Sequence, residues 1–539
     1  GEYVTPAPSA EVAAEGLMNA GLPVESVEDA AGAKGPTKVL DVEVTSNRTD
    51  CFCHVGLARE LAALTGGYFK MPPVSSSTGM GMGAGAMGGA VAASVLTSVR
   101  VQAGAGCAYY TARVIQGVKV GPSPEWLVKR LASIGLRPVN NVVDVTNFVL
   151  MELGQPLHAF DFDKLSGKGI LVRNENAGEK LEGIDGKSYA LEPTMLVIAD
   201  LEKPVAIAGV MGGKETEVTE QTVNVLLESA RFDPLSVRTS SRALGLRSDS
   251  SYRFERGVDP AMVDIASRRA AALIVEVAGG TLATGCVSEG TAGVKVLTVR
   301  MRLKRFEAIM GYPMAADRGL AILSALGFAA GLDEEVGGRD VLYTRVPTHR
   351  LDVDREIDLI EEIARIEGYT HVPTLDRVSH PVTPEAVGEK AARAVRLALV
   401  EGGFSEAVTV TFIGEGEGAA SLPVGGALIH LQHAGWKADV LRPSLLPSLL
   451  AVRRTNQNIG LPDVRVFETG ETFVQVGDAA SMAPTQRRVV AAVAGEVGML
   501  TGLLALLADR VNPALRIWVE PQEVGYFVKG ASGGVWMDL

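Results

Sequence analysis

Apolar and polar residues follow two periodicities along the chain, one of period two and one of helical spacing. Residues 39–44 alternate Val and Leu with Asp and Glu, which is typical of a strand with one buried face. Other segments are apolar runs typical of strands (196–199, 204–208 and 223–227) or have helical spacing (125–134 and 262–278). The chain is therefore predicted to be an α+β multidomain protein.

The same patterns divide the first part of the chain. Ser9 is a suitable N-cap for a helix that starts at residue 10, and residues 57–64 predict a second helix. Residues 1–73 are therefore expected to form an N-terminal α/β segment. Residues 74–94 are rich in Gly, Ala and Ser, which predicts a mobile linker.

Beyond that linker, the sequence predicts two further domains and a last module. Residues 95–295 mix strands with helices, as one sizeable α/β domain does. Residues 296–372 form a smaller unit with a basic start and an acidic helix near its end. A polar linker is expected at 373–389, and residues 390–539 form a last α/β region that opens with a helix.

Composition agrees with several folded domains. Of 539 residues, 47% are hydrophobic and 21% charged, which predicts three or four domains at about 150 residues each. Four cysteines are too few for a disulfide scaffold, and the net charge of −12 restricts nucleic-acid contacts to local basic patches. The longest uncharged stretch, residues 71–99, contains prolines and many glycines. We therefore predict no membrane span and expect a cytoplasmic protein.

Two motifs place polar or flexible residues among apolar ones. His158 follows a Gly-Gln-Pro turn, where it can move a proton or bond a hydroxyl at neutral pH. A histidine that is simply hydrogen-bonded into the turn is the alternative. The apolar run at 204–208 leads into Gly209, Gly212 and Gly213, which lets a ligand approach the backbone closely, although a hairpin turn explains this pattern equally well.

Glu228 is a carboxylate inside an apolar strand. Burying it is costly unless another group bonds it, and either Arg231 or a ligand hydroxyl can do so. A structural role for Glu228 is the alternative.

The stretch 231–257 is basic, with six arginines against three acids in a chain that is acidic overall. Such a segment suits a phosphate backbone, with Arg242 and Arg247 as candidate RNA contacts. The hydroxyls of Ser248 and Ser250 can orient a water or a ligand. A solvated arginine face, paired with the acids of the same stretch, is the alternative.

Residues 352–368 predict an acidic amphipathic helix. Ile357, Ile360 and Ile363 are expected to form its buried stripe, with Gly368 as the C-cap. Neighbouring carboxylates repel one another unless a cation or arginines neutralise them, and Mg²⁺ is a suitable cation. The candidate ligands are Asp352, Asp358, Glu361 and Glu362. A solvated face with a Glu361–Arg365 ion pair is the alternative.

Several strings, taken in their order along the chain, resemble the beta subunit of bacterial phenylalanyl-tRNA synthetase. They are VTSNRTDC at 44–51, GLAREL at 56–61, PVNNVVDVTN at 138–147, the motifs around His158, Gly209, Glu228 and Ser248, and the helix after Asp352. Each string is modest alone, but together they are specific and cover most of the chain from Glu2 to Phe473.

The resemblance implies an α2β2 tetramer in which an alpha subunit binds ATP and charges tRNA(Phe) with phenylalanine. The domains then correspond to a B3/B4-like editing domain at 95–295, a small B5-like domain of winged type at 296–372, and a B6/B7-like module at 390–539. That last module resembles a class II synthetase with a degenerate antiparallel sheet. In it, Val466 stands two residues before Glu468, where a catalytic arginine is expected, so aminoacylation by this chain alone is not predicted.

The resemblance also implies site residues. Glu228 is expected to bond the tyrosine hydroxyl of mischarged Tyr-tRNA(Phe), with His158 and Ser248 positioning ester and water and with Gly212 and Ser250 shaping the pocket. The helix acids match the family's Mg²⁺ positions. Little sequence separates Val27 from Val39, so the oligonucleotide-binding barrel of many members is not expected there, and no ferredoxin-like anticodon-binding domain is expected after Val519. A free-standing hydrolase and a structural subunit without editing are the competing interpretations.

Overall fold

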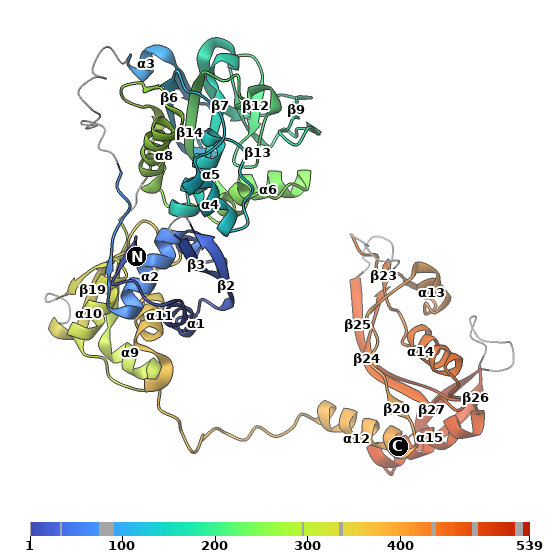
Figure 1. Cartoon of the computed structure of the whole chain (residues 1–539). Helices are drawn as coiled ribbons and strands as arrows, with labels where there is room; N and C mark the ends of the chain where they lie inside the picture. The colour runs from blue at the N-terminus through green and yellow to red at the C-terminus, as the bar shows by residue number, and fades with distance from the viewer. Residues whose placement is uncertain are drawn as a thin grey trace. The chain divides into compact units, whose positions relative to one another are not determined.

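The computed structural model describes residues 2–32, 35–74, 91–293, 296–333, 338–432, 438–476, 483–522 and 532–538. The chain divides into two compact units, Gly1–Asp376 and Arg377–Leu539 (Figure 1). Within the described ranges, no helix combines the length and the apolar character that crossing a membrane requires.

The N-terminal segment consists of two helices and a hairpin. Helix α1 (Ala10–Asn19) starts at Ser9, whose side chain accepts a hydrogen bond from the Val12 N–H, as predicted. Strands β2 (Val24–Gly32) and β3 (Gly35–Val42) pair antiparallel, and helix α2 (His54–Thr65) follows. Two short strands, β1 (Val4–Thr5) and β4 (Tyr68–Phe69), pair beside α2.

Two five-stranded sheets form the central domain. The first has the order β15-β6-β14-β7, with β16 also paired to β6; its strands are β15 (Thr281–Leu282), β6 (Cys107–Gln116), β14 (Asn224–Phe232), β7 (Leu157–Asp161) and β16 (Val287–Gly290). The second has the order β13-β12-β11-β8-β5; its strands are β13 (Met211–Gly212), β12 (Pro204–Ile207), β11 (Leu196–Ala199), β8 (Gly169–Asn174) and β5 (Ser98–Val101).

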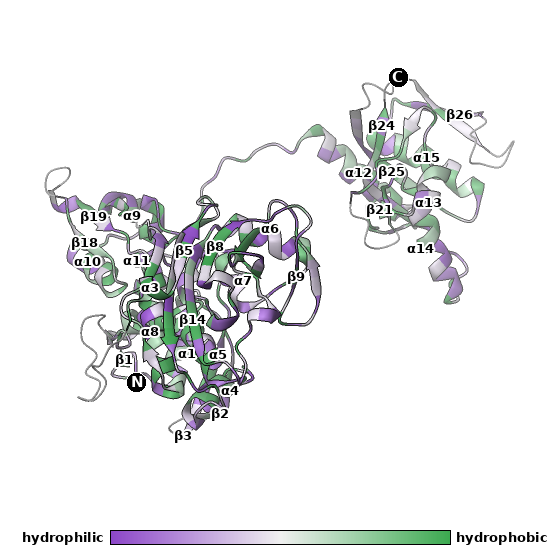
Figure 2. Ribbon diagram, turned by 90° about the horizontal axis from the view of Figure 1, so that it is seen from above, coloured by the Kyte–Doolittle hydropathy of each residue, from purple (hydrophilic) through white to green (hydrophobic). Residues whose placement is uncertain are grey.

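Strand β14 separates two cores because its side chains alternate between the faces of its sheet. Leu226 lies in a core that the two sheets share, whereas Leu227 lies in a core formed with the helices α4 (Glu125–Ser133), α5 (Asn141–Leu153) and α8 (Met262–Ala278). The layers are therefore helices, first sheet, second sheet. Figure 2 shows the apolar colouring along β14 in the interior of this domain.

The linker expected at 74–94 lies mostly outside the described residues. Its last residues, 91–94, belong to the fold, so that part of the prediction is wrong. Ala92 forms a bridge with Thr284, and the short helix α3 (Ala93–Leu96) starts with Ala93, which is 1% exposed. Burial of small apolar residues holds this end against the central domain.

The next domain combines a three-stranded sheet with three helices. The sheet has the order β17-β19-β18, formed by β17 (Thr298–Arg302), β19 (Val341–Arg345) and β18 (Ala329–Leu332). The helices are α9 (Leu303–Met310), α10 (Ala316–Ala325) and α11 (Glu356–Glu367). The apolar core lies between them and includes Phe306, Leu323, Leu342, Leu359 and Ile363.

Helix α11 differs from its predicted orientation. Ile360 and Ile363 are buried as expected, but Ile357 is 42% exposed and Leu359 takes its place in the core. Gly368 ends the helix with φ at 94°, as predicted. The predicted face was wrong because Glu362, one of the acids of this helix, is buried where it bonds Arg350 and Arg365. Apolar spacing alone does not reveal such a contact.

The second unit contains a sheet of the order β20-β24-β22, with β25 paired to β24. Strands β24 (Val466–Val476) and β25 (Ala483–Val493) pair antiparallel along their whole length. The remaining sheet strands are β20 (Ser405–Glu406) and β22 (Gly426–Ala427), and the longer helices are α12 (Val387–Glu401), α14 (Leu446–Asn458) and α15 (Val497–Val511). The helix predicted at the start of the 390–539 region is confirmed, but α12 already begins at Val387, inside the linker predicted at 373–389.

Candidate functional site

Strand register brings His158 and Glu228 together. Strands β7 and β14 are antiparallel, and Glu228 stands directly opposite His158. Side chains at directly opposed positions project from the same face of a sheet. On this face Phe160 and Leu226 are also opposed, and both lie in the core between the sheets, so His158 and Glu228 project toward the second sheet.

Gly212 completes this group from the second sheet. A Cβ atom added at Gly212 would lie 2.5 Å from Cε1 and 2.9 Å from Nε2 of His158, closer than side-chain atoms tolerate. The imidazole ring therefore occupies the space that any other residue at 212 would fill. Three residues predicted for one pocket thus meet across two sheets.

The imidazole of His158 is buried with an unsatisfied nitrogen. Its Nε2 has no hydrogen-bond partner in the part of the chain that the structure describes. Its ring packs edge-on against Phe160, with the ring centroids 4.4 Å apart. Burial lowers the pKa of His158 to about 4, so the ring is neutral at pH 7 and can accept or donate one hydrogen bond.

Glu228 is bonded by a residue that the sequence analysis did not consider. The Tyr110 hydroxyl donates to Oε2 of Glu228 over 2.8 Å, whereas Arg231, the partner considered, donates to the Ala292 carbonyl. Burial raises the pKa of Glu228 to about 8, and the Tyr110 hydrogen bond opposes that rise. Glu228 is thus largely protonated at pH 7. Tyr110 carries no local sequence signal, since it lies 118 residues away on β6.

Ser248 joins this region through the chain that leads into β13. It is the N-cap of helix α7 (Asp249–Phe254), where its hydroxyl accepts from the Ser251 N–H over 3.1 Å. The same hydroxyl donates to the Val210 carbonyl over 3.1 Å, two residues before Gly212. Ser250 lies half-buried in the first turn of α7. The Ser248 hydroxyl hydrogen is therefore already used in a hydrogen bond, and the hydroxyl can only accept one further hydrogen bond from a ligand through its remaining lone pair.

The basic stretch divides into paired and exposed arginines. Arg253 binds Asp249 over 3.2 Å, and Arg256 binds Glu255, which agrees with the alternative of an internally paired face for these two. Arg242 in the last turn of α6 (Pro234–Leu244) and Arg247 are exposed. Their side chains stand at the surface near the start of α7.

The acids predicted as metal ligands do not share one exposed face of α11. Glu361 is exposed, whereas Glu362 is 3% exposed and binds two arginines. Nη2 of Arg350 and Nε of Arg365 lie 2.7 and 3.0 Å from its Oε1. Burial alone raises the pKa of Glu362, but the bonds and charges of the two arginines outweigh it and hold that pKa at about 2. The alternative Glu361–Arg365 pair is also wrong, because Arg365 faces Glu362.

Buried ion pairs continue from Arg365 into the N-terminal segment. Nη2 of Arg365 lies 3.0 Å from Oε1 of Glu60 on α2, and Glu60 also accepts from Arg48. Arg48 holds both carboxylate oxygens of Asp50 at 3.0 Å. All four side chains lie in the buried contact between α2, the loop before it and α11.

At the other end, Arg350 holds Asp352 with hydrogen bonds of 2.9 and 3.0 Å. Asp358 accepts the backbone N–H groups of Asp354 and Arg355 and the Arg355 side chain. We call the connected buried set the arginine network. It consists of Asp50, Arg48, Glu60, Arg365, Glu362, Arg350 and Asp352.

The arginine network does not fit a metal cage formed by this chain alone. Among the described residues, the three-ligand grouping with atoms within 4.8 Å of one another is Asp50, Cys51 and Glu60. Arg48 already donates to all three of them. A guanidinium thus supplies the positive charge there, and the acids of α11 do not converge. The contacts of these acids within the chain therefore do not fit the magnesium site that the resemblance implies.

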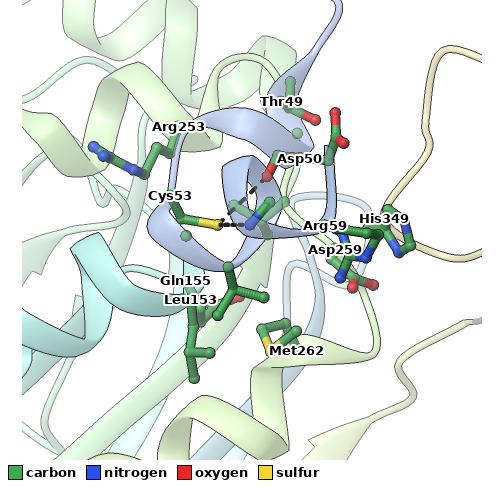
Figure 3. A pocket seen from close by; sticks show the side chains of 15 residues that line it. Thr49, Asp50, Cys53, Arg59, Leu153, Gln155, Arg253, Asp259, Met262 and His349 are labelled. Carbon is green, nitrogen blue, oxygen red and sulfur yellow. Dashed lines mark hydrogen bonds between the residues drawn. The ribbon is translucent and has the colours of Figure 1, made fainter. Parts of the chain in front are cut away.

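A small cavity lies where the N-terminal segment, the central domain and the following domain meet (Figure 3). Cys53, Arg59, Gln155 and His349 are among the residues that line it. Its volume of about 30 Å³ suits a bound water rather than an amino acid or a nucleotide. Gln155 Oε1 and His349 Nε2 are buried without a partner among the described residues, which is the polar lining that an internal water needs.

Comparison with known proteins shows the family of the chain. Residues 106–279 match the B3/4 domain, residues 299–369 the tRNA synthetase B5 domain, and residues 373–537 the phenylalanyl tRNA synthetase beta chain CLM domain. The phenylalanine–tRNA ligase beta subunit of Rhodopirellula baltica is 40% identical over 92% of this chain and 71% of its own length. The chain belongs to the phenylalanine–tRNA ligase beta subunit family.

Other beta subunits of this family extend well beyond the matched region. Those of Anaeromyxobacter dehalogenans and Moorella thermoacetica are 44% and 40% identical over 81% of this chain, which spans 53% of their length. The chain thus spans about half the length of these curated relatives. A solved N-terminal fragment of the Pyrococcus horikoshii beta subunit is 13% identical, with a TM-score of 0.38, over 67% of this chain and 95% of the fragment.

In the region that matches the CLM domain, Glu468 is neutralised within the chain. Glu468 is 3% exposed, and Arg442 Nη1 lies 2.8 Å from its Oε1. The Thr409 hydroxyl donates to its Oε2 over 2.6 Å. Val466 lies buried two residues before Glu468 on β24. These contacts give Glu468 a structural role in the sheet.

Proposed function

We propose that this chain works as the beta subunit of an α2β2 phenylalanine–tRNA ligase in the cytoplasm. In this assembly an alpha subunit binds ATP and charges tRNA(Phe), while this chain supplies the second unit as a non-catalytic module of class II type. Family membership and the internal Arg442–Glu468 pair support this division of labour.

Co-expression with an alpha subunit from a bacterial relative tests the assembly. Co-purification as a heterotetramer, with a mass measured by light scattering, is the expected result. A chain that stays a stable monomer in the presence of the alpha subunit would contradict the proposal and favour a free-standing hydrolase.

We further propose that the His158–Glu228 site hydrolyses mischarged Tyr-tRNA(Phe). The observation that carries this proposal is the buried, neutral His158, whose Nε2 lacks a partner among the described residues, opposite a buried Glu228. An aminoacylation site shaped for phenylalanine rejects the added hydroxyl of tyrosine only weakly. A second site that bonds this hydroxyl directly improves the discrimination against tyrosine.

Each residue of this site has a distinct task in the proposed hydrolysis. Glu228 bonds the phenol hydroxyl of the wrong amino acid, and His158 with the free lone pair of Ser248 positions the ester and the attacking water. Gly212 and Ser250 shape the pocket, Gly212 by leaving room for the imidazole. Water attacks the ester carbonyl carbon, the bond to the tRNA ribose oxygen breaks, and tyrosine and free tRNA(Phe) leave.

Deacylation of Tyr-tRNA(Phe) tests the editing proposal. Glu228→Ala is expected to slow it about tenfold or more, because one direct hydrogen bond to the substrate is lost, while phenylalanine charging stays unchanged. Glu361→Gln, an exposed carboxylate on α11, is the matched control. If the wild-type complex never deacylates Tyr-tRNA(Phe), the chain is a structural subunit and the editing proposal fails.

We also propose that Arg242 and Arg247 contact the tRNA backbone beside this site. Both are exposed and lie close in sequence to Ser248, and arginine suits phosphate because of its planar donor fork. Replacing both arginines is expected to weaken hydrolysis of Tyr-tRNA(Phe) without changing its selectivity. The reason is that phosphate contacts add affinity for tRNA and no base selectivity.

A further inference from the structure

Tyr110 and Glu228 meet because of how two strands pair. On β6 and β14, Tyr110 stands opposite Ala230 and Ala112 stands opposite Glu228. The two long side chains are therefore diagonal neighbours on one face, within reach of each other. The alanines opposite them leave the space in which the phenol and the carboxyl group meet.

The contact between Tyr110 and Glu228 is buried. Tyr110 is 0% exposed, and Glu228 is 5% exposed. A phenol can donate one hydrogen bond, and the Tyr110 hydroxyl donates it to Oε2 of Glu228 over 2.8 Å. Because the Tyr110 side chain is fully buried, its hydroxyl has no exposed position from which to bond water instead. The bond therefore holds Oε2 of Glu228 in place, and Oε1 is the oxygen that Tyr110 does not engage.

We propose that Tyr110 is a positioning residue that orients the Glu228 carboxyl group so that Oε1 meets the para-hydroxyl of a misloaded aromatic amino acid. This inference rests on the proposed editing function and deepens it. The carboxyl group then bonds two phenols, one from the chain and one from the substrate, through its two oxygens. A side chain without the hydroxyl leaves Oε1 desolvated and unbonded, so the site rejects phenylalanine.

The predicted effect is on selectivity rather than on hydrolysis in general. Without the Tyr110 hydroxyl, the Glu228 carboxyl group can rotate, so the penalty for a missing substrate hydroxyl falls. Tyr110→Phe is expected to slow deacylation of Tyr-tRNA(Phe) about tenfold, which is the effect of one hydrogen bond. Deacylation of Phe-tRNA(Phe) should stay slow and nearly unchanged. A merely structural role would slow both substrates alike.

The experiment compares four forms of the full chain, each co-expressed with the alpha subunit: wild type, Tyr110→Phe, Glu228→Ala and the double variant. Single-turnover deacylation of Tyr-tRNA(Phe) and Phe-tRNA(Phe) is measured for each, together with thermal unfolding. Tyr3→Phe is the matched control, because the Tyr3 hydroxyl also donates to a carboxylate, Glu152, over 2.8 Å, away from β14. In the Glu228→Ala background, Tyr110→Phe should have no further effect.

The outcomes separate this inference from the function beneath it. A wild-type complex that does not deacylate Tyr-tRNA(Phe) overturns the editing proposal and this inference with it. If wild type is active and Glu228→Ala is not, while Tyr110→Phe keeps wild-type rate and selectivity, only the inference on Tyr110 is overturned. The same follows if Tyr110→Phe slows the reaction equally with and without Glu228.

Discussion

Replacing Glu60 with glutamine tests the arginine network at its centre. The Glu60 carboxylate accepts hydrogen bonds from Arg48 on one side and from Arg365 on the other, and it is 2% exposed. A glutamine has nearly the same size but offers one acceptor oxygen, so its amide N–H groups must face a guanidinium. Removing one partner of a buried ion pair costs about 3–5 kcal/mol, and the desolvated arginines cannot recover this from water.

The loss should appear where α2 packs on the B5-type domain. Arg365 lies on α11 and Glu60 on α2, so Glu60→Gln is expected to weaken that contact and to leave the sheets of the central domain intact. Hydrogen exchange of the amides in α2 and α11 is the most direct assay, because a chain of several domains does not unfold in two states. Urea unfolding of the full chain should show the accompanying shift of its transition to a lower urea concentration.

Glu361→Gln is the matched control for this prediction. Glu361 is the exposed carboxylate next to Glu362 on α11, and loss of an exposed charge typically changes stability by less than about 0.5 kcal/mol. If Glu60→Gln changes stability no more than Glu361→Gln and leaves exchange in both helices unchanged, the arginine network does not hold these domains together.

Three further outcomes are expected. First, the pKa of Glu228 is raised from 4.5 to about 8, so the folded chain holds a proton that the unfolded chain releases, and stability falls as pH rises between these values. The stability of Glu228→Gln relative to wild type, measured by thermal unfolding, should therefore rise by up to about 1.4 kcal/mol per pH unit from pH 5 to 8. A stability difference that does not change with pH would contradict this. Second, Gly212→Ala should lower stability by about 1–3 kcal/mol and slow Tyr-tRNA(Phe) deacylation, because the new Cβ lies 2.5 Å from His158; unchanged melting and deacylation would show that the ring can move freely. Third, removing Mg²⁺ with EDTA should leave the melting temperature of the chain unchanged, since arginines already neutralise Glu362; a fall of several degrees would instead reveal a structural metal.

The local pattern of apolar and polar residues was sufficient to predict most helices and strands. The helix expected at 262–278 is α8 with the same ends, and the run at 196–199 is β11. Both succeed because apolar spacing reports which side of an element is buried, whatever lies on that side. The predicted stripe of α11 failed at Ile357, which is 42% exposed, whereas Glu362 on the same helix is buried against Arg350 from elsewhere in the chain.

The sequence by itself also selected His158 and Glu228 as unusual residues, because a titratable group among apolar neighbours stands out locally. Only the tertiary structure decided that they face each other, that Tyr110 bonds Glu228 and that Arg48, Arg350 and Arg365 neutralise the acids around them. The physical reason is distance along the chain. Strand pairing joins Tyr110 to Glu228 across 118 positions, and helix docking joins Arg365 to Glu60 across 305. A buried charge is stable only with a partner, and no local pattern identifies a partner so far along the chain.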